Sequence, residues 1–194
     1  MSDTLRVLAF AGSTRQESFN KKLVQIAATG AREAGADVTV IDLRDYRLPL
    51  FDPDDESAHG KPDNATALKQ LMIDHDAFLI ASPEYNSSVT GVLKNTIDWV
   101  SRSDDGEAAP LVAFRGKVVT LMSASPGALG GLRGLVHLRA ILGNLGCIVL
   151  PTQVAVPKAH EAFKADSTLV DETQQQRILG LGRTLVAIGV KLSR

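Results

Sequence analysis

The sequence predicts an α/β protein with a three-layer, doubly wound fold, in which helices cover both faces of a five-stranded parallel sheet. Short apolar segments alternate with amphipathic helical segments five times, and this alternation is typical of parallel sheets. No repeat, linker or low-complexity tract interrupts the pattern, and 194 residues suit one core better than two. We therefore expect a single domain over residues 1–194.

Each expected element rests on a local pattern. The first strand is apolar on both faces, and the helix after it has Leu23, Ile26 and Ala27 at helical spacing, with Gly35 as its stop signal. The polar, proline-containing stretch 44–62 is predicted to be a loop, and 103–110 breaks the pattern again. The expected strands are 5–11, 38–43, 77–81, 117–122 and a fifth beginning at 147–151; the expected helices are 18–34, 65–74, 91–100, 132–145 and 169–192.

Composition excludes several functional classes. A net charge of −1 and a pI near 6.4 give no basic field for nucleic acid. No apolar run approaches the ~18 residues of a membrane helix, and residues 1–6 lack the features of a signal peptide. A chain with one cysteine forms no internal disulfide. We expect a cytoplasmic protein that binds neither nucleic acid nor membrane.

The loop after the first strand, residues 11–20, carries groups that suit a phosphate. Gly12 allows a tight turn, Ser13 and Ser18 offer hydroxyls, Arg15 adds a positive charge, and a helix N-terminus follows. The loop has neither the lysine of a Walker motif nor the Gly-x-Gly-x-x-Gly of a Rossmann turn. Ordinary capping, with Ser18 as N-cap, explains the same residues equally well.

Two further loops follow the third and fourth strands. In the first of these, Pro83 restrains the chain, Tyr85 offers a flat apolar surface, and Asn86 can bond the edge of a heteroaromatic ring. The glycines of loop 123–131 allow a close approach to a ligand. Taken singly, these are also an ordinary turn and a flexible connector. With strand order 2-1-3-4-5, all three loops meet at one edge of the sheet, where a planar cofactor with a phosphate would bind.

Together these residues resemble the NAD(P)H-dependent FMN reductase family, which includes bacterial quinone, azo-dye and chromate reductases. The resemblance extends over about residues 5–155 and rests on Gly12-Ser13-Thr14-Arg15-x-x-Ser18-x-Asn20, Pro83-Glu84-Tyr85-Asn86, the helix Gly91 to Trp99, and Ser125-Pro126-Gly127-x-x-Gly130-Gly131. It implies a flavodoxin-like fold, non-covalent FMN, and a homodimer or homotetramer. It also implies that hydride passes from NADPH or NADH to the flavin and on to small-molecule electron acceptors, namely quinone, azo, flavin or metal-oxyanion compounds.

The resemblance also implies roles for individual residues. Matched position by position, the residues expected to bind the FMN phosphate are Ser13, Arg15, Ser18 and Asn20, and Phe19 is a further cofactor contact. The residues expected to line the isoalloxazine ring are Pro83, Glu84, Tyr85 and Asn86. The residues expected to close the other side of the cofactor site are Ser123, Ser125 and Gly127. Ser87 stands where many members have glycine. No side chain is expected to act as a catalytic acid or base, because the flavin supplies the chemistry.

The other residues with reactive side chains are expected to have structural roles and not to take part in binding or catalysis. Cys147 is expected to be a buried thiol, Trp99 a core or interface residue, and the four histidines surface groups, since none has metal-ligand spacing. Arg133 and Arg139 are candidates for ion pairs across an interface.

Two other functions fit the same fold. An electron carrier or flavin-binding regulator would usually be more acidic than a net charge of −1. A phosphoryl-binding hydrolase would need a nucleophile and metal ligands that the motifs lack. The sequence fixes neither the choice between NADH and NADPH nor the acceptor.

Overall fold

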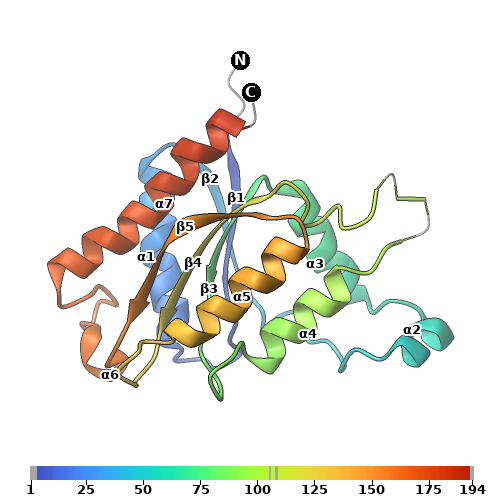
Figure 1. The fold of residues 1–194 in the computed structure, drawn as a ribbon, viewed down its shortest axis with the longest axis horizontal. Coiled ribbons are helices and arrows are strands. Elements are labelled where there is room, and N and C mark those ends of the chain that lie inside the picture. Colours follow the sequence, from blue (N-terminus) through green and yellow to red (C-terminus); the bar gives the residue numbers. More distant parts are fainter. Residues whose placement is uncertain (1–3, 105, 108, 193–194) are drawn as a thin grey trace.

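A computed structural model describes residues 4–104, 106–107 and 109–192. Its five-stranded parallel sheet has the order β2-β1-β3-β4-β5, which confirms the predicted topology. The carboxyl ends of the strands lie at the lower edge in Figure 1. The strands are β1 (Arg6–Ala11), β2 (Asp37–Asp42), β3 (Ala77–Ala81), β4 (Val118–Ala124) and β5 (Ile148–Val156).

Helices cover both faces of the sheet, as predicted. Helices α1 and α7 pack on one face, while α3, α4 and α5 pack on the other (Figure 1). The helices are α1 (Phe19–Glu33), α2 (Pro53–His59), α3 (Asp63–Asp74), α4 (Gly91–Val100), α5 (Leu132–Asn144), α6 (Ala159–Ala162) and α7 (Glu172–Leu192). Within the described ranges, no helix has both the length and the hydropathy to cross a membrane.

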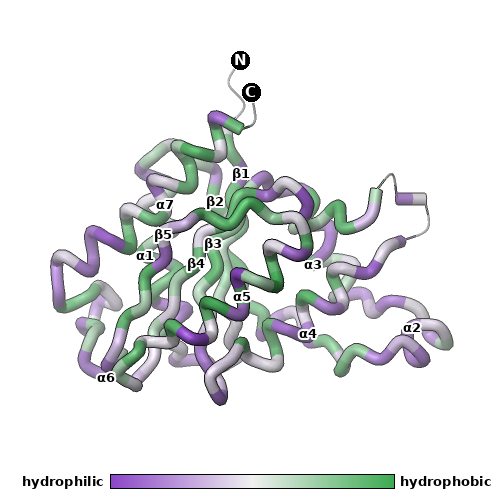
Figure 2. Tube along the Cα trace, viewed as in Figure 1, coloured by the Kyte–Doolittle hydropathy of each residue, from purple (hydrophilic) through white to green (hydrophobic). Residues whose placement is uncertain are grey.

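The core consists of two apolar clusters, one on each face of the sheet. Along β1, Val7 and Ala9 join the cluster under α1 and α7, whereas Leu8 and Phe10 join the cluster under α3, α4 and α5. This two-sided burial explains why the central strands are hydrophobic along their whole length (Figure 2). The apolar runs in the sequence therefore predict these strands well.

Some boundaries differ from the expected ones. Stretch 44–62 is not wholly a loop, because it contains α2. That helix has Pro53 at its first position, and the carboxylate of Asp52 accepts a bond from the Asp54 amide at 2.8 Å. It has no buried residue, so hydrophobic periodicity gave no signal. Strand β4 extends to Ala124, β5 extends to Val156, α7 begins at Glu172 instead of residue 169, and α6 was not predicted.

Two glycines allow α1 and α7 to pack closely. A Cβ atom on Gly30 would lie 2.1 Å from the Leu179 carbonyl oxygen, and one on Gly182 would lie 2.0 Å from that of Ala27. Any larger residue at either position must therefore push the helices apart. Because the first turn of α1 borders the candidate site, this packing also fixes the position of that turn.

Candidate functional site

A cleft opens where β1, β3 and β4 end, and the three loops singled out in the sequence meet there. Its lining residues are Ser13, Arg15, Ser18, Phe19, Asn20, Pro83, Glu84, Tyr85, Ala124, Ser125 and Pro126. The enclosed space is about 80 Å³, below the roughly 300–1,000 Å³ of pockets that engulf a whole ligand. A ligand the size of FMN would therefore be gripped at one end and lie largely along the surface.

Three predicted site residues do not line this cleft. Because β4 extends beyond its expected end, the pleat turns Ser123 toward α5, where its hydroxyl is buried under Gly131. Gly127 is held within its own loop, since its carbonyl accepts bonds from Gly130 and Lys158. Asn86 is exposed in a turn beyond the rim.

The first loop is held by main-chain contacts at Gly12. Its amide donates to the Ala81 carbonyl at 2.9 Å, and its carbonyl accepts from the Thr90 hydroxyl at 2.7 Å. A Cβ on Gly12 would lie 2.9 Å from the side chain of Leu93, which explains the need for glycine. The role of Thr90 was not predicted from the sequence, although threonine just before a helical pattern is a recognisable N-cap signal.

The beginning of α1 is suited to binding an anion. Ser18 is the N-cap residue, yet no side chain caps the first turn and no acidic residue lies in it. First-turn amides and the positive end of the helix dipole are therefore available to a ligand. Ser13 and Ser18 are buried beside this turn, and their hydroxyls add donors. The geometry suits a phosphate better than simple capping.

Aromatic side chains position the guanidinium of Arg15. It lies 5.4 Å from the ring centroid of Phe19, which stacks on Phe163 with centroids 5.8 Å apart. Among the described residues, Arg15 forms no ion pair. Its charge is thus left free at the mouth of the cleft.

The second loop is a two-residue hairpin turn at the rim. Tyr85 and Ser88 exchange two main-chain hydrogen bonds of 3.0 Å, and Asn86 and Ser87 both have positive φ, at 50° and 66°. This pairing is typical of a type I′ turn, which favours Asn-Gly. The turn presents the ring of Tyr85, which is 56% exposed, beside the cleft.

Glu84 uses its carboxylate within the protein. The Arg133 side chain donates to it at 2.9 Å and the Gly134 amide at 3.0 Å. Burial acts to raise the pKa of this carboxyl, but the bonds and charge of Arg133 and the Gly134 amide hold it below its usual value. Glu84 therefore joins the Tyr85 turn to the start of α5, and only its remaining atoms face the cleft.

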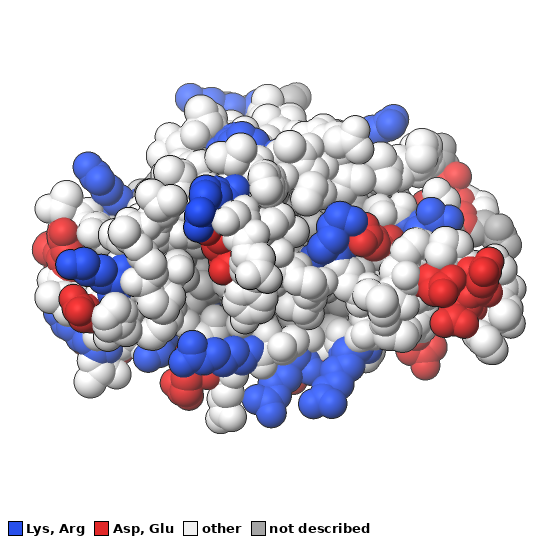
Figure 3. Space-filling model, turned by 60° about the horizontal axis from the view of Figure 1, so that its bottom comes forward, with Lys and Arg blue, Asp and Glu red and all other residues white. Residues whose placement is uncertain are grey.

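The edge that carries the cleft is rich in basic side chains. Figure 3 brings the lower edge of Figure 1 forward and shows Lys and Arg side chains in a row across its lower part, with few acidic groups there. A negatively charged ligand would therefore approach this edge favourably, even though the chain as a whole has a net charge of −1.

Comparison with known proteins agrees with the motifs. Residues 5–161 match the family of NADPH-dependent FMN reductases. The chain belongs to this family. An NAD(P)H-dependent FMN reductase of Pseudomonas aeruginosa is 35% identical over 92% of this chain and 91% of its own. A quinone reductase of Escherichia coli is 38% identical over 77% of this chain and 76% of its own.

A solved structure extends the family likeness to three dimensions. The NAD(P)H:(acceptor) oxidoreductase FerB of Paracoccus denitrificans superposes with a TM-score of 0.80 at 26% identity, covering 97% of this chain and 98% of its own. A flavodoxin-like sheet with the order 2-1-3-4-5 is therefore the common frame of this FMN reductase and its relatives.

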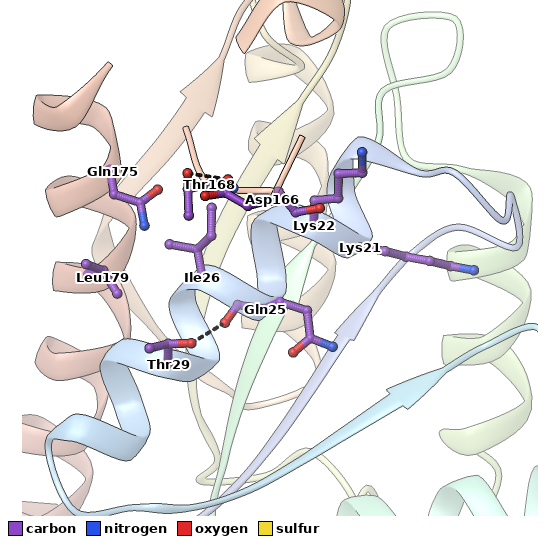
Figure 4. A pocket seen from close by; sticks show the side chains of 10 residues that line it. Lys21, Lys22, Gln25, Ile26, Thr29, Asp166, Thr168, Gln175 and Leu179 are labelled. Carbon is purple, nitrogen blue, oxygen red and sulfur yellow. Dashed lines mark hydrogen bonds between the residues drawn. The ribbon is translucent and has the colours of Figure 1, made fainter. Parts of the chain in front are cut away.

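A wider hollow of about 420 Å³ lies elsewhere, between α1 and the segment that leads into α7 (Figure 4). Two of its charged side chains already have partners within the chain: the Lys21 ammonium binds Asp42 at 2.5 Å, and Asp166 accepts from the Thr168 hydroxyl at 2.7 Å. In Figure 4 the Lys21 side chain runs away from Asp166 and Thr168. The hollow therefore lacks the converging free groups of the cleft.

The remaining reactive residues are mostly structural, as expected. Cys147 is buried, its thiol donates to the Phe114 carbonyl at 3.3 Å, and burial raises its pKa to about 12. Trp99 is a core residue, since it is buried and its indole nitrogen donates to the Pro49 carbonyl.

One expectation about side chains was wrong, and another, the ion pairs across an interface, stays a prediction. His75 is buried, not on the surface, because its ring nitrogen bonds the Leu71 carbonyl at 2.6 Å. Arg133 and Arg139 find partners inside this chain. Arg133 binds Glu84, while Arg139 binds the Leu150 carbonyl and Gln153.

Proposed function

We propose that this protein is an NAD(P)H-dependent, FMN-containing oxidoreductase that reduces quinones and, more broadly, azo compounds, free flavins and metal oxyanions. The observation that carries the proposal is the cleft itself: three loops with the motifs of the FMN reductase family meet there around an uncapped helix N-terminus. Relatives named as quinone reductase and 2-hydroxy-1,4-benzoquinone reductase support quinones as acceptors.

The residues at and beside the cleft suit the phosphate and the ring of FMN. Ser13, Ser18, Arg15 and the first amides of α1 offer donors and positive charge for a phosphate. Pro83 and Tyr85 offer flat apolar surface for a ring at the opposite wall. Arg133 and the Gly134 amide compensate the charge of Glu84, the acidic residue of this lining.

In this mechanism the chain binds and orients. Bound FMN supplies the hydride and electron transfer, for which side chains have no equivalent. Arg15 and the α1 amides would hold the phosphate, while the turn 83–86 would set the position of the ring. The engaged carboxylate of Glu84 fixes that turn against α5, so the ring surface is held before a substrate arrives. We assign no side chain a proton-transfer role.

We also propose that the protein is a cytoplasmic homodimer or homotetramer. Leu129, Leu132 and Val136 are exposed apolar side chains on and before α5, and Tyr85 is exposed at the neighbouring rim. Several large apolar side chains exposed near one another favour a subunit interface at this place. Light scattering of the purified protein tests this proposal; a monomer at micromolar concentration would contradict it.

The function is tested with purified protein. We expect a yellow protein with flavin absorbance, bleaching of that absorbance by NADPH or NADH without oxygen, and steady turnover with added benzoquinone. A colourless protein that does not bind added FMN would overturn the proposal. Flavin binding with negligible quinone turnover would favour the electron-carrier alternative instead.

A further inference from the structure

A second hollow lies directly beside the candidate FMN cleft. It has a volume of about 330 Å³ and is lined by Thr14, Arg44 and Arg47. Ser13 and Arg15, the neighbours of Thr14 in sequence, line the FMN cleft. Loop 13–15 is therefore a wall with a cavity on each side, and we call the second cavity the Arg44–Arg47 pocket.

The arginines of this pocket are exposed and carry uncompensated charge. Among the described residues, neither Arg44 nor Arg47 forms an ion pair, and Asp45 between them pairs with neither. Asp42, at the end of β2, is paired with Lys21 at 2.5 Å. The side-chain contact of Arg44 is to a neutral group, the Gln16 amide oxygen, at 3.5 Å. Two guanidinium groups therefore remain available to an anion.

The main chain holds these arginines in place. The Arg44 amide donates to the Asp42 carboxylate at 3.0 Å, and the Arg47 carbonyl accepts from the Asn64 side chain at 2.9 Å. Leu43, just before the pocket, is fully buried. The turn that carries the two arginines follows β2, and loop 13–15 follows β1. Because β2 pairs with β1 in parallel, the two segments leave the sheet side by side. The pocket is thus a preformed feature of the same sheet edge.

We propose that Thr14, Arg44 and Arg47 bind the 2′-phosphate of NADPH, so that this protein prefers NADPH to NADH. Two guanidinium groups and a hydroxyl match a phosphate monoester in charge and in hydrogen bonding. The inference rests on the proposed function, because it assigns the pocket to the nicotinamide donor of that reaction.

The choice of this phosphate follows from the ligands of the reaction. The FMN phosphate has its own donors on the other side of loop 13–15. Quinones carry no phosphate, and NADH carries only the pyrophosphate that it shares with NADPH. Of the two nucleotide donors, NADPH alone carries a phosphate monoester, at the 2′ position of its adenosine end. A dinucleotide whose nicotinamide lies near Tyr85 would extend along the cleft toward loop 13–15.

Kinetics with both nucleotides test the proposal. We expect the double variant R44A/R47A to lose roughly 10- to 100-fold in kcat/KM for NADPH, mainly through KM, as expected for lost charged hydrogen bonds. Its kcat/KM for NADH should change less than about twofold. Arg177→Ala removes the same charge from an exposed position on α7, outside both cavities, and should change neither value. Equal losses with both nucleotides, or no loss, would overturn the proposal.

Binding measurements separate this proposal from the proposed function. In calorimetry with the FMN-loaded protein, adenosine 2′-phosphate should bind more tightly than adenosine 5′-phosphate or inorganic phosphate. The double variant R44A/R47A should lose that preference while it binds FMN with normal affinity. Equal binding of the three probes would refute the subsite even if the enzyme is active. Failure to bind FMN or to oxidise either nucleotide would refute the proposed function. The affinity for adenosine 2′-phosphate would still show whether the Arg44–Arg47 pocket binds this phosphate.

Discussion

The side-chain amide of Asn20 forms two hydrogen bonds with the main chain of Ala124, a residue 104 positions later. The Asn20 nitrogen donates to the Ala124 carbonyl at 2.8 Å, and the Ala124 amide donates to the Asn20 oxygen at 2.9 Å. Both residues line the cleft, and Asn20 is only 3% exposed. This pair joins the first turn of α1 to the end of β4, so two walls of the site are fixed to each other.

Replacing Asn20 should therefore lower the stability of the fold and loosen the contact between two walls of the site. We expect Asn20→Ala to lower the free energy of unfolding by about 2–4 kcal/mol, since it removes two bonds and leaves buried main-chain groups of Ala124 without partners. Urea unfolding measures this loss. Asn144→Ala, at an exposed position at the end of α5, should change stability by less than about 0.5 kcal/mol. Equal stability of the two variants would show that the bonds contribute little.

Arg15 tests the phosphate end of the cleft. We expect Arg15→Ala to weaken FMN binding by roughly 10- to 100-fold, because a charged hydrogen bond to the phosphate is lost. The melting temperature of the FMN-free protein should change little, since Arg15 is exposed and forms no ion pair among the described residues. Fluorescence titration with FMN gives the affinity, and Arg177→Ala is again the control. Unchanged affinity would remove Arg15 from the site.

The glycines of α7 offer a matched pair for the packing against α1. Gly182→Ala should destabilise the protein by about 2 kcal/mol or more, because the new methyl group meets the Ala27 carbonyl and overpacks the contact. Gly180→Ala has open space and should instead stabilise the helix, by up to about 1 kcal/mol. Thermal unfolding distinguishes the two. If both variants gain stability, the close helix contact does not hold in solution.

The sequence predicts the strands and most of the cleft because local patterns mark them, whereas the sheet order follows from the flavodoxin-like fold. Apolar runs mark β1 and β3, and turn residues such as Gly12 and Pro83 mark the loops that follow them. Helix α2 was not predicted because it has no buried residue and therefore no hydrophobic periodicity. Ser123 does not line the cleft because it lies within β4, where alternate side chains point to opposite faces and its hydroxyl is buried under Gly131. The Asn20 bond to Ala124 joins distant segments, and no local pattern reveals such a partner.

Ser87 stands where the family resemblance led us to expect glycine, and its φ of 66° gives this difference a physical meaning. Glycine adopts this conformation without the steric penalty of a Cβ atom. We expect Ser87→Gly to raise the free energy of unfolding by about 0.5–1 kcal/mol. Ser87→Ala keeps the Cβ atom and should bring no such gain. A gain from alanine equal to that from glycine would assign the effect to the hydroxyl instead of the backbone.

The carboxylate of Asp104 gives the fold a predictable sensitivity to acid. Asp104 binds Lys61 and the buried Lys69, the latter at 2.9 Å. Burial acts to raise the pKa of Asp104, but the hydrogen bonds and charges of the two lysines lower it to about 2. Because the folded pKa lies below the ordinary value of 3.8, the stabilisation is complete above that value. It disappears as the pH falls through about 2.

Unfolding measured between pH 7 and pH 2 tests this link. Asp104→Asn should be less stable than the unmodified protein at pH 7, by no more than about 1 kcal/mol, since the side chain is 44% exposed and water screens the pair. The difference should shrink below pH 4 and be largely lost by pH 2, because the carboxyl of Asp104 becomes protonated over this range. Asp37→Asn, at an exposed position at the start of β2, should show no such convergence. A stability difference that stays constant across this range would mean that the ionised carboxylate does not hold the two lysines in place.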